Sequence, residues 1–176
     1  MTSRTLLPFM LACLLMPPDL MAKEAGKMTG LTITSAAFAH KTAIPGRYTC
    51  DGQDMSPPLQ IDAIPAGAKS LALVMDDPDA PAGTWVHWVM WNIPPHIGEI
   101  KENSPPAGAV QGVNSWQRNR YGGPCPPSGT HRYFFKVYAL DITLNLPPSA
   151  TRAALDGAMQ GHIIGTGELL GTYRRK

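Results

Sequence analysis

The side chains that can take part in chemistry gather in three short stretches of the sequence. Three aspartates and two prolines lie within residues 76–81, and His87 follows six residues after Pro81. His131 comes directly after residues 121–130, a loop that three prolines stiffen and three glycines open. Imidazoles and backbone N–H groups can donate hydrogen bonds to an anion, and carboxylates can orient the imidazoles or meet a cationic amine. The combination indicates a functional site that can receive a small anion.

The donors in this loop are its backbone N–H groups, because prolines have none. They belong to Gly122, Gly123, Cys125, Ser128, Gly129 and Thr130. Each feature also has a purely structural interpretation. A single histidine on a buried strand is more often a satisfied core residue, and aspartates beside prolines usually form a solvated turn. Two histidines, an aspartate loop and a rigid loop in one small chain favour the functional interpretation.

The elements that must position these residues are predicted to be mainly strands. Runs of apolar, aromatic and β-branched residues, and one helical pattern after two prolines, identify them. Strands are expected at residues 31–35, 70–75, 85–93, 131–140 and 166–173, and a helix at residues 151–160. The alternation of a strand places His87 on one face with Trp85, Val89 and Trp91. It places His131 on the same face as Tyr133 and Phe135. Strands in succession with almost no helix between them argue against a parallel βαβ fold.

The composition agrees with a compact, turn-rich domain. The chain has 176 residues, the size of one domain. With 44% hydrophobic and 16% charged residues it is not an intrinsically disordered chain. Its 18 prolines and 17 glycines argue against a helical bundle. The net charge of +2 is spread without a basic stripe, so we expect no nucleic-acid partner.

The first 22 residues resemble a secretory signal peptide. One arginine supplies a positive region, residues 6–16 form an apolar run too short to cross a bilayer, and a cleavage site ends at Ala22. A lipid anchor on Cys13 and an N-terminal core helix are the alternatives. We therefore expect residues 1–22 to be a signal peptide and residues 23–176 to form a single domain in the periplasm or outside the cell.

Two cysteines remain in the mature chain, Cys50 and Cys125, each in a turn-rich segment. An even pair in an oxidising compartment is compatible with a disulfide. The sequence alone does not bring their Cα atoms within bonding distance, so two free thiols are the alternative.

Two long motifs resemble the signatures of the phosphatidylethanolamine-binding proteins. Residues 77–81 (DPDAP), followed by residues 85–88 (WVHW) and 92–94 (NIP), resemble the first signature. Residues 121–133 (YGGPCPPSGTHRY) resemble the second. Two long motifs in the right order are strong evidence for the fold, and weaker evidence for the biochemical role.

The resemblance extends over nearly all of residues 29–173, through residues 138–140 and 171–173. The stretch 50–58 (CDGQDMSPP) is similar to the bacterial branch known as Raf kinase inhibitor-like. The resemblance implies a mainly β fold with a large central antiparallel sheet, a smaller second sheet and a short helix near the C-terminus. The C-terminal helix of the animal members has no counterpart after Tyr173.

The resemblance also implies a small surface pocket for phosphate-type anions and head groups such as phosphorylethanolamine. By motif position, the pocket residues are Asp77, Asp79, Pro81, Trp85, His87, Gly123, Pro126, Pro127, His131 and Tyr133. The family fold brings the turns of both cysteines to one end of the molecule, which favours the Cys50–Cys125 disulfide. Bacterial relatives suggest a homodimer.

These features predict a non-enzymatic binding protein, comparable to a kinase or protease inhibitor, with no cofactor and no metal. A hydrolase is disfavoured, because there is no G-x-S-x-G motif and Ser128 has no evident paired base. The alternative is a metal-dependent enzyme in which His87, His131 and an aspartate form a two-histidine, one-carboxylate site. Against it, the sequence contains no H-x-H or H-x-x-x-H pair.

Overall fold

The computed structural model describes residues 29–175, and the predicted signal peptide, residues 1–22, lies outside the described residues, as does Cys13. The described elements follow the chain in an order that contains many strands, one short 3-10 helix and one α-helix. They are β1 (Thr29–Gly30), β2 (Thr32–Thr34), β3 (Thr42–Ala43), the 3-10 helix Gly46–Tyr48, β4 (Leu59–Asp62), β5 (Ser70–Asp77), β6 (Trp85–Ile93), β7 (Glu99–Ile100), β8 (Val110–Gln111), β9 (Thr130–Leu140), α1 (Arg152–Met159) and β10 (Ile163–Arg174).

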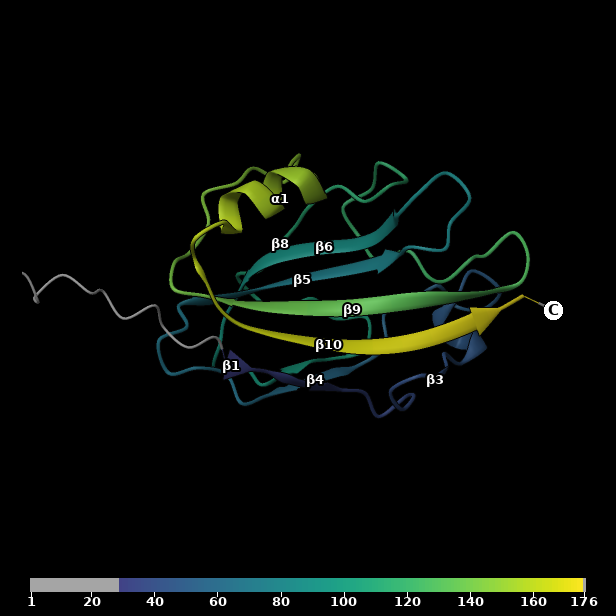
Figure 1. Cartoon of the computed structure of the whole chain (residues 1–176), viewed down its shortest axis with the longest axis horizontal. Coiled ribbons are helices and arrows are strands. Elements are labelled where there is room, and N and C mark those ends of the chain that lie inside the picture. The colour runs from purple at the N-terminus through teal and green to yellow at the C-terminus, as the bar shows by residue number, and fades with distance from the viewer. Residues whose placement is uncertain (1–28, 176) are drawn as a thin grey trace, which may run out of the picture.

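The strands form two sheets (Figure 1). The large sheet contains six strands in the order β1-β10-β9-β5-β6-β8, and β3, which also pairs with β10. The long central strands are antiparallel to one another, whereas the short strands β1 and β3 run parallel to β10. The small sheet has three antiparallel strands in the order β2-β4-β7. The predicted fold, mainly β with a large and a small sheet and one short helix, is confirmed.

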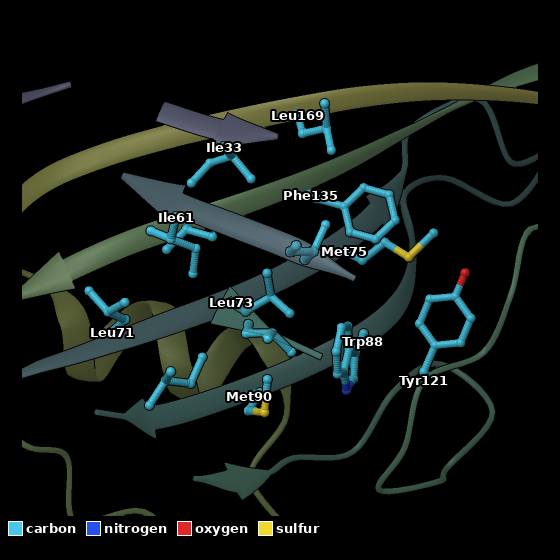
Figure 2. Close-up of a cluster of buried hydrophobic side chains, with 14 of the residues drawn as sticks. Ile33, Ile61, Leu71, Leu73, Met75, Trp88, Met90, Tyr121, Phe135 and Leu169 are labelled. Carbon is cyan, nitrogen blue, oxygen red and sulfur yellow. The ribbon is translucent and has the colours of Figure 1, made fainter. Parts of the chain in front are cut away.

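The main hydrophobic core fills the space between the two sheets (Figure 2). The large sheet contributes Leu73, Trp88 and Phe135, and the small sheet contributes Ile33 and Ile61, all of them buried. These side chains alternate with residues on the opposite face of each strand, as the pleat requires. Burial of this apolar surface is the main favourable term in the stability of the domain.

Helix α1 covers the other face of the large sheet (Figure 1). Its buried residues Leu155 and Met159 lie one turn apart and belong to a second apolar cluster with Val74 and Trp91. Both faces of β5 are therefore covered, which explains its continuous apolar run. The helix begins and ends within one residue of the predicted range. No helix within residues 29–175 is long and apolar enough to cross a membrane.

Strand β5 extends two residues beyond the predicted strand, through Asp76 and Asp77. Buried Asp76 accepts hydrogen bonds from Lys136 Nζ at 2.8 and 2.9 Å and from Arg152 Nη1 at 2.8 Å. Asp77 accepts a hydrogen bond from His131 at 2.7 Å. Each carboxylate is paired by a side chain from a neighbouring element, so the strand can continue where the apolar run stops.

A β-bulge in β6 turns His87 to the face of the sheet opposite the predicted one. The register of the β5–β6 pair shifts opposite Asp76, which makes His87 an extra residue in its strand. Val89 and Trp91 remain on the side of the large sheet that α1 covers. His87 turns to the other side, where its ring lies 5.2 Å from the ring of Tyr133. The prediction that His87 shares a face with Val89 and Trp91 is therefore wrong.

Candidate anion-binding site

The predicted site residues meet around a cavity of about 300 Å³ at one end of the large sheet. There β5 ends, β6 begins and β9 begins, and the loop before β9 closes the rim. The lining residues are Asp77, Ala80, Pro81, Ala82, Trp85, His87, Trp116, Cys125, Pro126, Pro127 and His131. Of the ten residues that the sequence assigned to the site, only Asp79, Gly123 and Tyr133 are not part of this lining.

His131 and Asp77 form a buried pair on one side of the cavity. His131 Nδ1 donates a hydrogen bond to Asp77 Oδ2 at 2.7 Å, and the side chains are 9% and 4% exposed. The other carboxylate oxygen accepts a hydrogen bond from the N–H of Asp79 at 2.8 Å. The carboxylate thus fixes the orientation of the imidazole and keeps a proton on Nδ1, so Nε2 is the ring nitrogen left for a ligand.

His87 lies on β6, which is separated from β9 by β5, and a backbone oxygen holds its ring. Its Nδ1 lies 2.7 Å from the carbonyl oxygen of Gly122, which can only accept, so Nδ1 carries a proton. Neutral His87 therefore offers Nε2 as an acceptor. Burial lowers the pKa of His87 below its usual 6.5, and the hydrogen bond to Gly122 and the charge of Asp77 oppose this shift. His87 is neutral near pH 7 in the free protein.

This burial predicts that the free energy of unfolding falls as the pH falls below 6.5. The unfolded chain then binds a proton at His87 that the folded chain does not bind. The contribution of His87 to the free energy of unfolding is therefore fully present above pH 6.5, and it is lost as the pH falls toward the lower pKa of His87 in the folded protein. The slope from one such group is at most about 1.4 kcal/mol per pH unit. Urea denaturation between pH 5.5 and 7.5 should show a smaller slope in His87→Gln, and equal slopes would contradict the assignment.

Asp79 turns away from the cavity toward Arg132. Its carboxylate accepts hydrogen bonds from Arg132 Nη2 at 2.6 Å, from Nε at 2.9 Å and from the backbone N–H at 2.9 Å. The side-chain hydrogen bond from Arg132 lowers the pKa of Asp79. Asp79 therefore joins the loop after β5 to β9. Its contribution to the cavity is the hydrogen bond from its backbone N–H to the carboxylate of Asp77.

Tyr133 packs against His87 behind the cavity lining. It is fully buried, and its ring meets His87 edge to face. Burial, followed by the charge of Asp77, raises the pKa of Tyr133 well above its usual value. Tyr133 therefore stays neutral and packs beneath His87, instead of lining the cavity.

Two of the predicted backbone donors are already used within the protein. The N–H of Gly122 donates to His87 O at 3.1 Å, and the N–H of Gly123 donates to Asp54 Oδ1 at 2.6 Å. A Cβ atom at Gly123 would lie 2.6 Å from the oxygen of Tyr48, so the close approach requires glycine. The prediction that Gly122 and Gly123 donate to an anion is wrong, since these N–H groups position the rim.

Trp116 lines the cavity and was not predicted from the sequence. Its ring centroid lies 5.3 Å from that of Trp85 and 5.0 Å from that of His87. Buried Asn114 shapes this segment: its Oδ1 accepts from the N–H of Trp116 at 3.0 Å, and its Nδ2 donates to His87 O at 3.3 Å. A Cβ atom at Gly122 would meet the Trp116 ring at 2.5 Å. The sequence signal was an isolated tryptophan shortly after an asparagine that can form such a turn.

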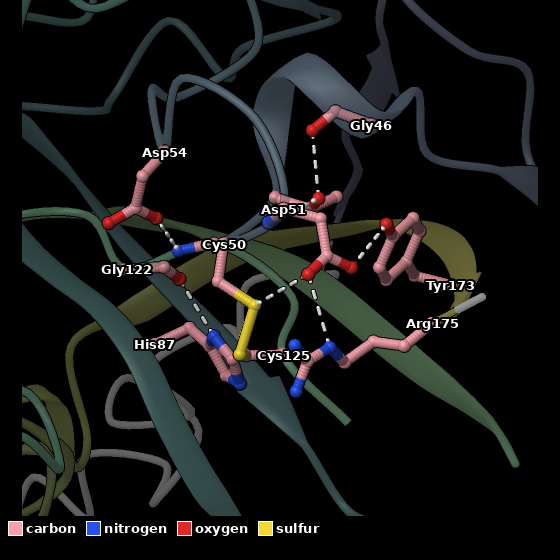
Figure 3. The surroundings of a disulfide bond; sticks show 11 residues. Gly46, Cys50, Asp51, Asp54, His87, Gly122, Cys125, Tyr173 and Arg175 are labelled. Atoms are coloured by element: carbon pink, nitrogen blue, oxygen red, sulfur yellow. Dashed lines mark hydrogen bonds and ion pairs between the residues drawn. A yellow bond between two sulfur atoms is a disulfide. The ribbon is translucent and has the colours of Figure 1, made fainter. Parts of the chain in front are cut away.

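The structure contains the predicted disulfide between Cys50 and Cys125, with their Cα atoms 5.4 Å apart (Figure 3). Cys125 lies in the loop that closes the cavity. The N–H of Cys50 also donates to the oxygen of Pro124 at 3.1 Å. The disulfide and this hydrogen bond therefore both join the cavity rim to the segment that follows the 3-10 helix.

Within residues 29–175, no group of three His, Cys, Asp or Glu side chains is arranged to hold a metal ion. Asp77 and His131 bind each other, and His87 binds the oxygen of Gly122. The three residues of the alternative metal site thus line one cavity without forming a ligand set.

A model of the phosphatidylethanolamine-binding protein family matches residues 34–174. The chain belongs to this family. It is 51% identical over 150 residues to a UPF0098 protein of Methanothermobacter thermautotrophicus, and the match covers 82% of this chain and 99% of that protein. A UPF0098 protein of Pyrococcus abyssi is 53% identical over 151 residues, which cover 81% of this chain and 84% of that protein.

Two solved structures agree with the fold. A phosphatidylethanolamine-binding protein homolog from Chlamydia trachomatis has a TM-score of 0.81 and 41% identity, with 84% of this chain and 99% of that chain covered. The Escherichia coli protein YbcL, described as a member of the mammalian family, has a TM-score of 0.79 and 30% identity, with 84% and 100% covered.

Proposed function

We propose that this chain is a non-enzymatic binding protein whose cavity takes a phosphomonoester anion, such as phosphate or phosphorylethanolamine. The observation that carries the proposal is the pair of inward-facing histidines, His87 and His131, each held through Nδ1. Trp85 also lines the cavity and has a buried Nε1 donor without a partner within residues 29–175. These groups can supply hydrogen bonds to phosphate oxygens.

The lining offers no hydroxyl, free thiol or amine that could act as a nucleophile. Among residues 29–175 it includes no serine, threonine or lysine, and Cys125 is bonded to Cys50. The carboxylate of Asp77 could attack a phosphoryl group, but both of its oxygens already accept hydrogen bonds, from His131 and from the N–H of Asp79. This composition supports binding without turnover, and phosphorylethanolamine incubated with the protein should release no inorganic phosphate.

The charge of the ligand must be met by imidazole. Among residues 29–175, no arginine or lysine lines the cavity, and Asp77 is the only carboxylate in the lining. A phosphate dianion therefore needs a protonated imidazole in the cavity. Alternatively, the phosphate group binds as the monoanion and donates a hydrogen bond to Nε2 of neutral His87. In either case the complex holds more protons than the separate partners.

We therefore expect the affinity for phosphorylethanolamine to rise as the pH falls from 8 toward 6. The rise should level off near pH 6, where a phosphomonoester takes up its own proton. Calorimetric titrations in buffers of different ionisation enthalpy should show proton uptake on binding above pH 7. An affinity that is constant, or that increases with pH, would contradict the proposed function.

We also propose that the chain is exported. The support is the order of one arginine, an apolar run and a small residue at Ala22. The mature protein should begin near Lys23, as intact-mass measurement of protein made in a bacterial host will reveal. A full-length product that stays in the cytoplasm would contradict the export proposal.

A further inference from the structure

The two cysteines differ in where their side chains lie. Cys50 is exposed, whereas Cys125 is partly buried and lines the anion cavity. We propose that the Cys50–Cys125 disulfide is a redox-sensitive lock on the cavity rim, which a dithiol reductant opens and which weakens ligand binding when open. This inference rests on the proposed anion-binding function of the cavity.

The loop before Cys125 is held independently of the disulfide. The N–H groups of Gly122 and Gly123 are bonded to His87 and Asp54, as described above. Tyr121 Oη donates to the oxygen of Tyr48 at 2.7 Å. Reduction therefore leaves this half of the loop, and the carbonyl that holds His87, in place.

The loop after Cys125 has no such support. Within the described chain, residues 126–129 form no hydrogen bond or ion pair, and β9 begins only at Thr130. Pro126, which is buried, and Pro127, which is exposed, lie in this half and line the cavity. The disulfide is thus the last cross-link or hydrogen bond before β9.

The partner loop is a fixed anchor. Asp51, next to Cys50, accepts hydrogen bonds from Tyr173 Oη at 2.9 Å and from Arg175 Nε at 3.1 Å (Figure 3). These contacts tie the Cys50 turn to the end of β10. The disulfide from Cys125 to this turn therefore fixes the cavity rim relative to the large sheet.

The exposure of Cys50 determines which cysteine the reductant attacks. A thiolate of the dithiol attacks Cys50 Sγ and forms a mixed disulfide, and Cys125 leaves as a thiolate that takes up a proton. The second thiol of the reductant then attacks its own sulfur in the mixed disulfide and releases Cys50, which also takes up a proton. The dithiol is oxidised to a disulfide, and the protein disulfide is reduced to two thiols by two electrons.

Opening the lock should weaken binding for one main reason. In the oxidised protein the rim is already ordered, whereas in the reduced protein the ligand must order Pro126 and Pro127 as it binds. We expect the affinity to fall about tenfold, which corresponds to fixing the backbone of roughly one residue. By linkage, saturating ligand should lower the reduction potential of the disulfide by about 30 mV, since a tenfold change equals about 30 mV for two electrons.

The test compares phosphorylethanolamine binding at pH 6.5 by calorimetry in three samples: oxidised wild type, wild type reduced with dithiothreitol, and Cys50→Ser/Cys125→Ser. The reduced wild type and the double variant should both bind about tenfold more weakly, and the variant should not respond to dithiothreitol. Reoxidation of the wild type should restore the affinity. Thiol labelling and circular dichroism should report two free thiols in a protein that is still folded.

Several outcomes would overturn the inference. Equal affinity in the oxidised and reduced proteins would mean that the rim does not depend on the disulfide. Failure of dithiothreitol to release thiols from the native protein, or unfolding on reduction, would make the bond purely structural. Absence of binding in the oxidised wild type would instead contradict the proposed function, so the two failures are distinguishable.

Discussion

Removing the Cys50–Cys125 disulfide should lower the free energy of unfolding by about 4.5 kcal/mol. The two cysteines are 75 residues apart, and cross-linking a loop of that length removes much of the conformational entropy of the unfolded chain. The chain-entropy relation gives about 3 kcal/mol for a 15-residue loop and about 4.7 kcal/mol for a 100-residue loop. Guanidinium denaturation of the oxidised wild type and of Cys50→Ser/Cys125→Ser measures the difference.

The reduced wild type is the matched control for this experiment, since it differs from the oxidised protein by the bond alone. It should have the same denaturation midpoint as the double variant. A loss below about 1 kcal/mol in both samples would mean that the unfolded chain is already restricted without the disulfide.

His131→Ala should weaken the binding of phosphorylethanolamine by about 1.5–3 kcal/mol, or roughly 10- to 150-fold. This is the usual contribution of a charge-assisted hydrogen bond, which His131 Nε2 would make to a phosphate oxygen. Because His131 and Asp77 form a buried pair, the variant should also lose stability, and the affinity is compared under conditions in which it is still folded. Calorimetry at pH 6.5 measures the affinity, and circular dichroism confirms the fold.

The chain provides a matched control in a second histidine–aspartate pair. His162 Nδ1 lies 2.8 Å from Asp141 Oδ1, and the two side chains are 41% and 49% exposed. His162 does not line the cavity. His162→Ala should therefore bind as the wild type does. Unchanged affinity in a folded His131→Ala protein would mean that the Asp77–His131 pair has a structural role only.

Much of this architecture could be predicted from the sequence because local patterns determine it. The strand 85–93 was predicted with the bounds that the structure has, since aromatic and β-branched residues fill it and prolines end it. The helix after Pro148 was predicted within one residue. His87 and His131 were found from their chemistry and their places in the predicted strands, and motif resemblance added cavity residues such as Pro81.

The errors come from contacts between segments that are distant in the sequence. The bulge that turns His87 depends on how β6 pairs with β5, and strand alternation alone cannot reveal it. The N–H of Gly123 is used by Asp54, 69 residues earlier in the chain. Trp116 reaches the cavity because Asn114 folds its segment. The sequence shows that Asn114 can form a turn, but it does not show that the turn brings Trp116 to His87.

The most direct test of the account is a crystal structure of the protein grown at pH 6 with phosphorylethanolamine at saturating concentration. We expect the phosphate group in the cavity, with one oxygen within hydrogen-bonding distance of His131 Nε2 and another near His87 Nε2. The disulfide should be intact, with Pro126 and Pro127 against the ligand. A cavity that holds only water under these conditions, or a ligand bound elsewhere on the molecule, would contradict the account.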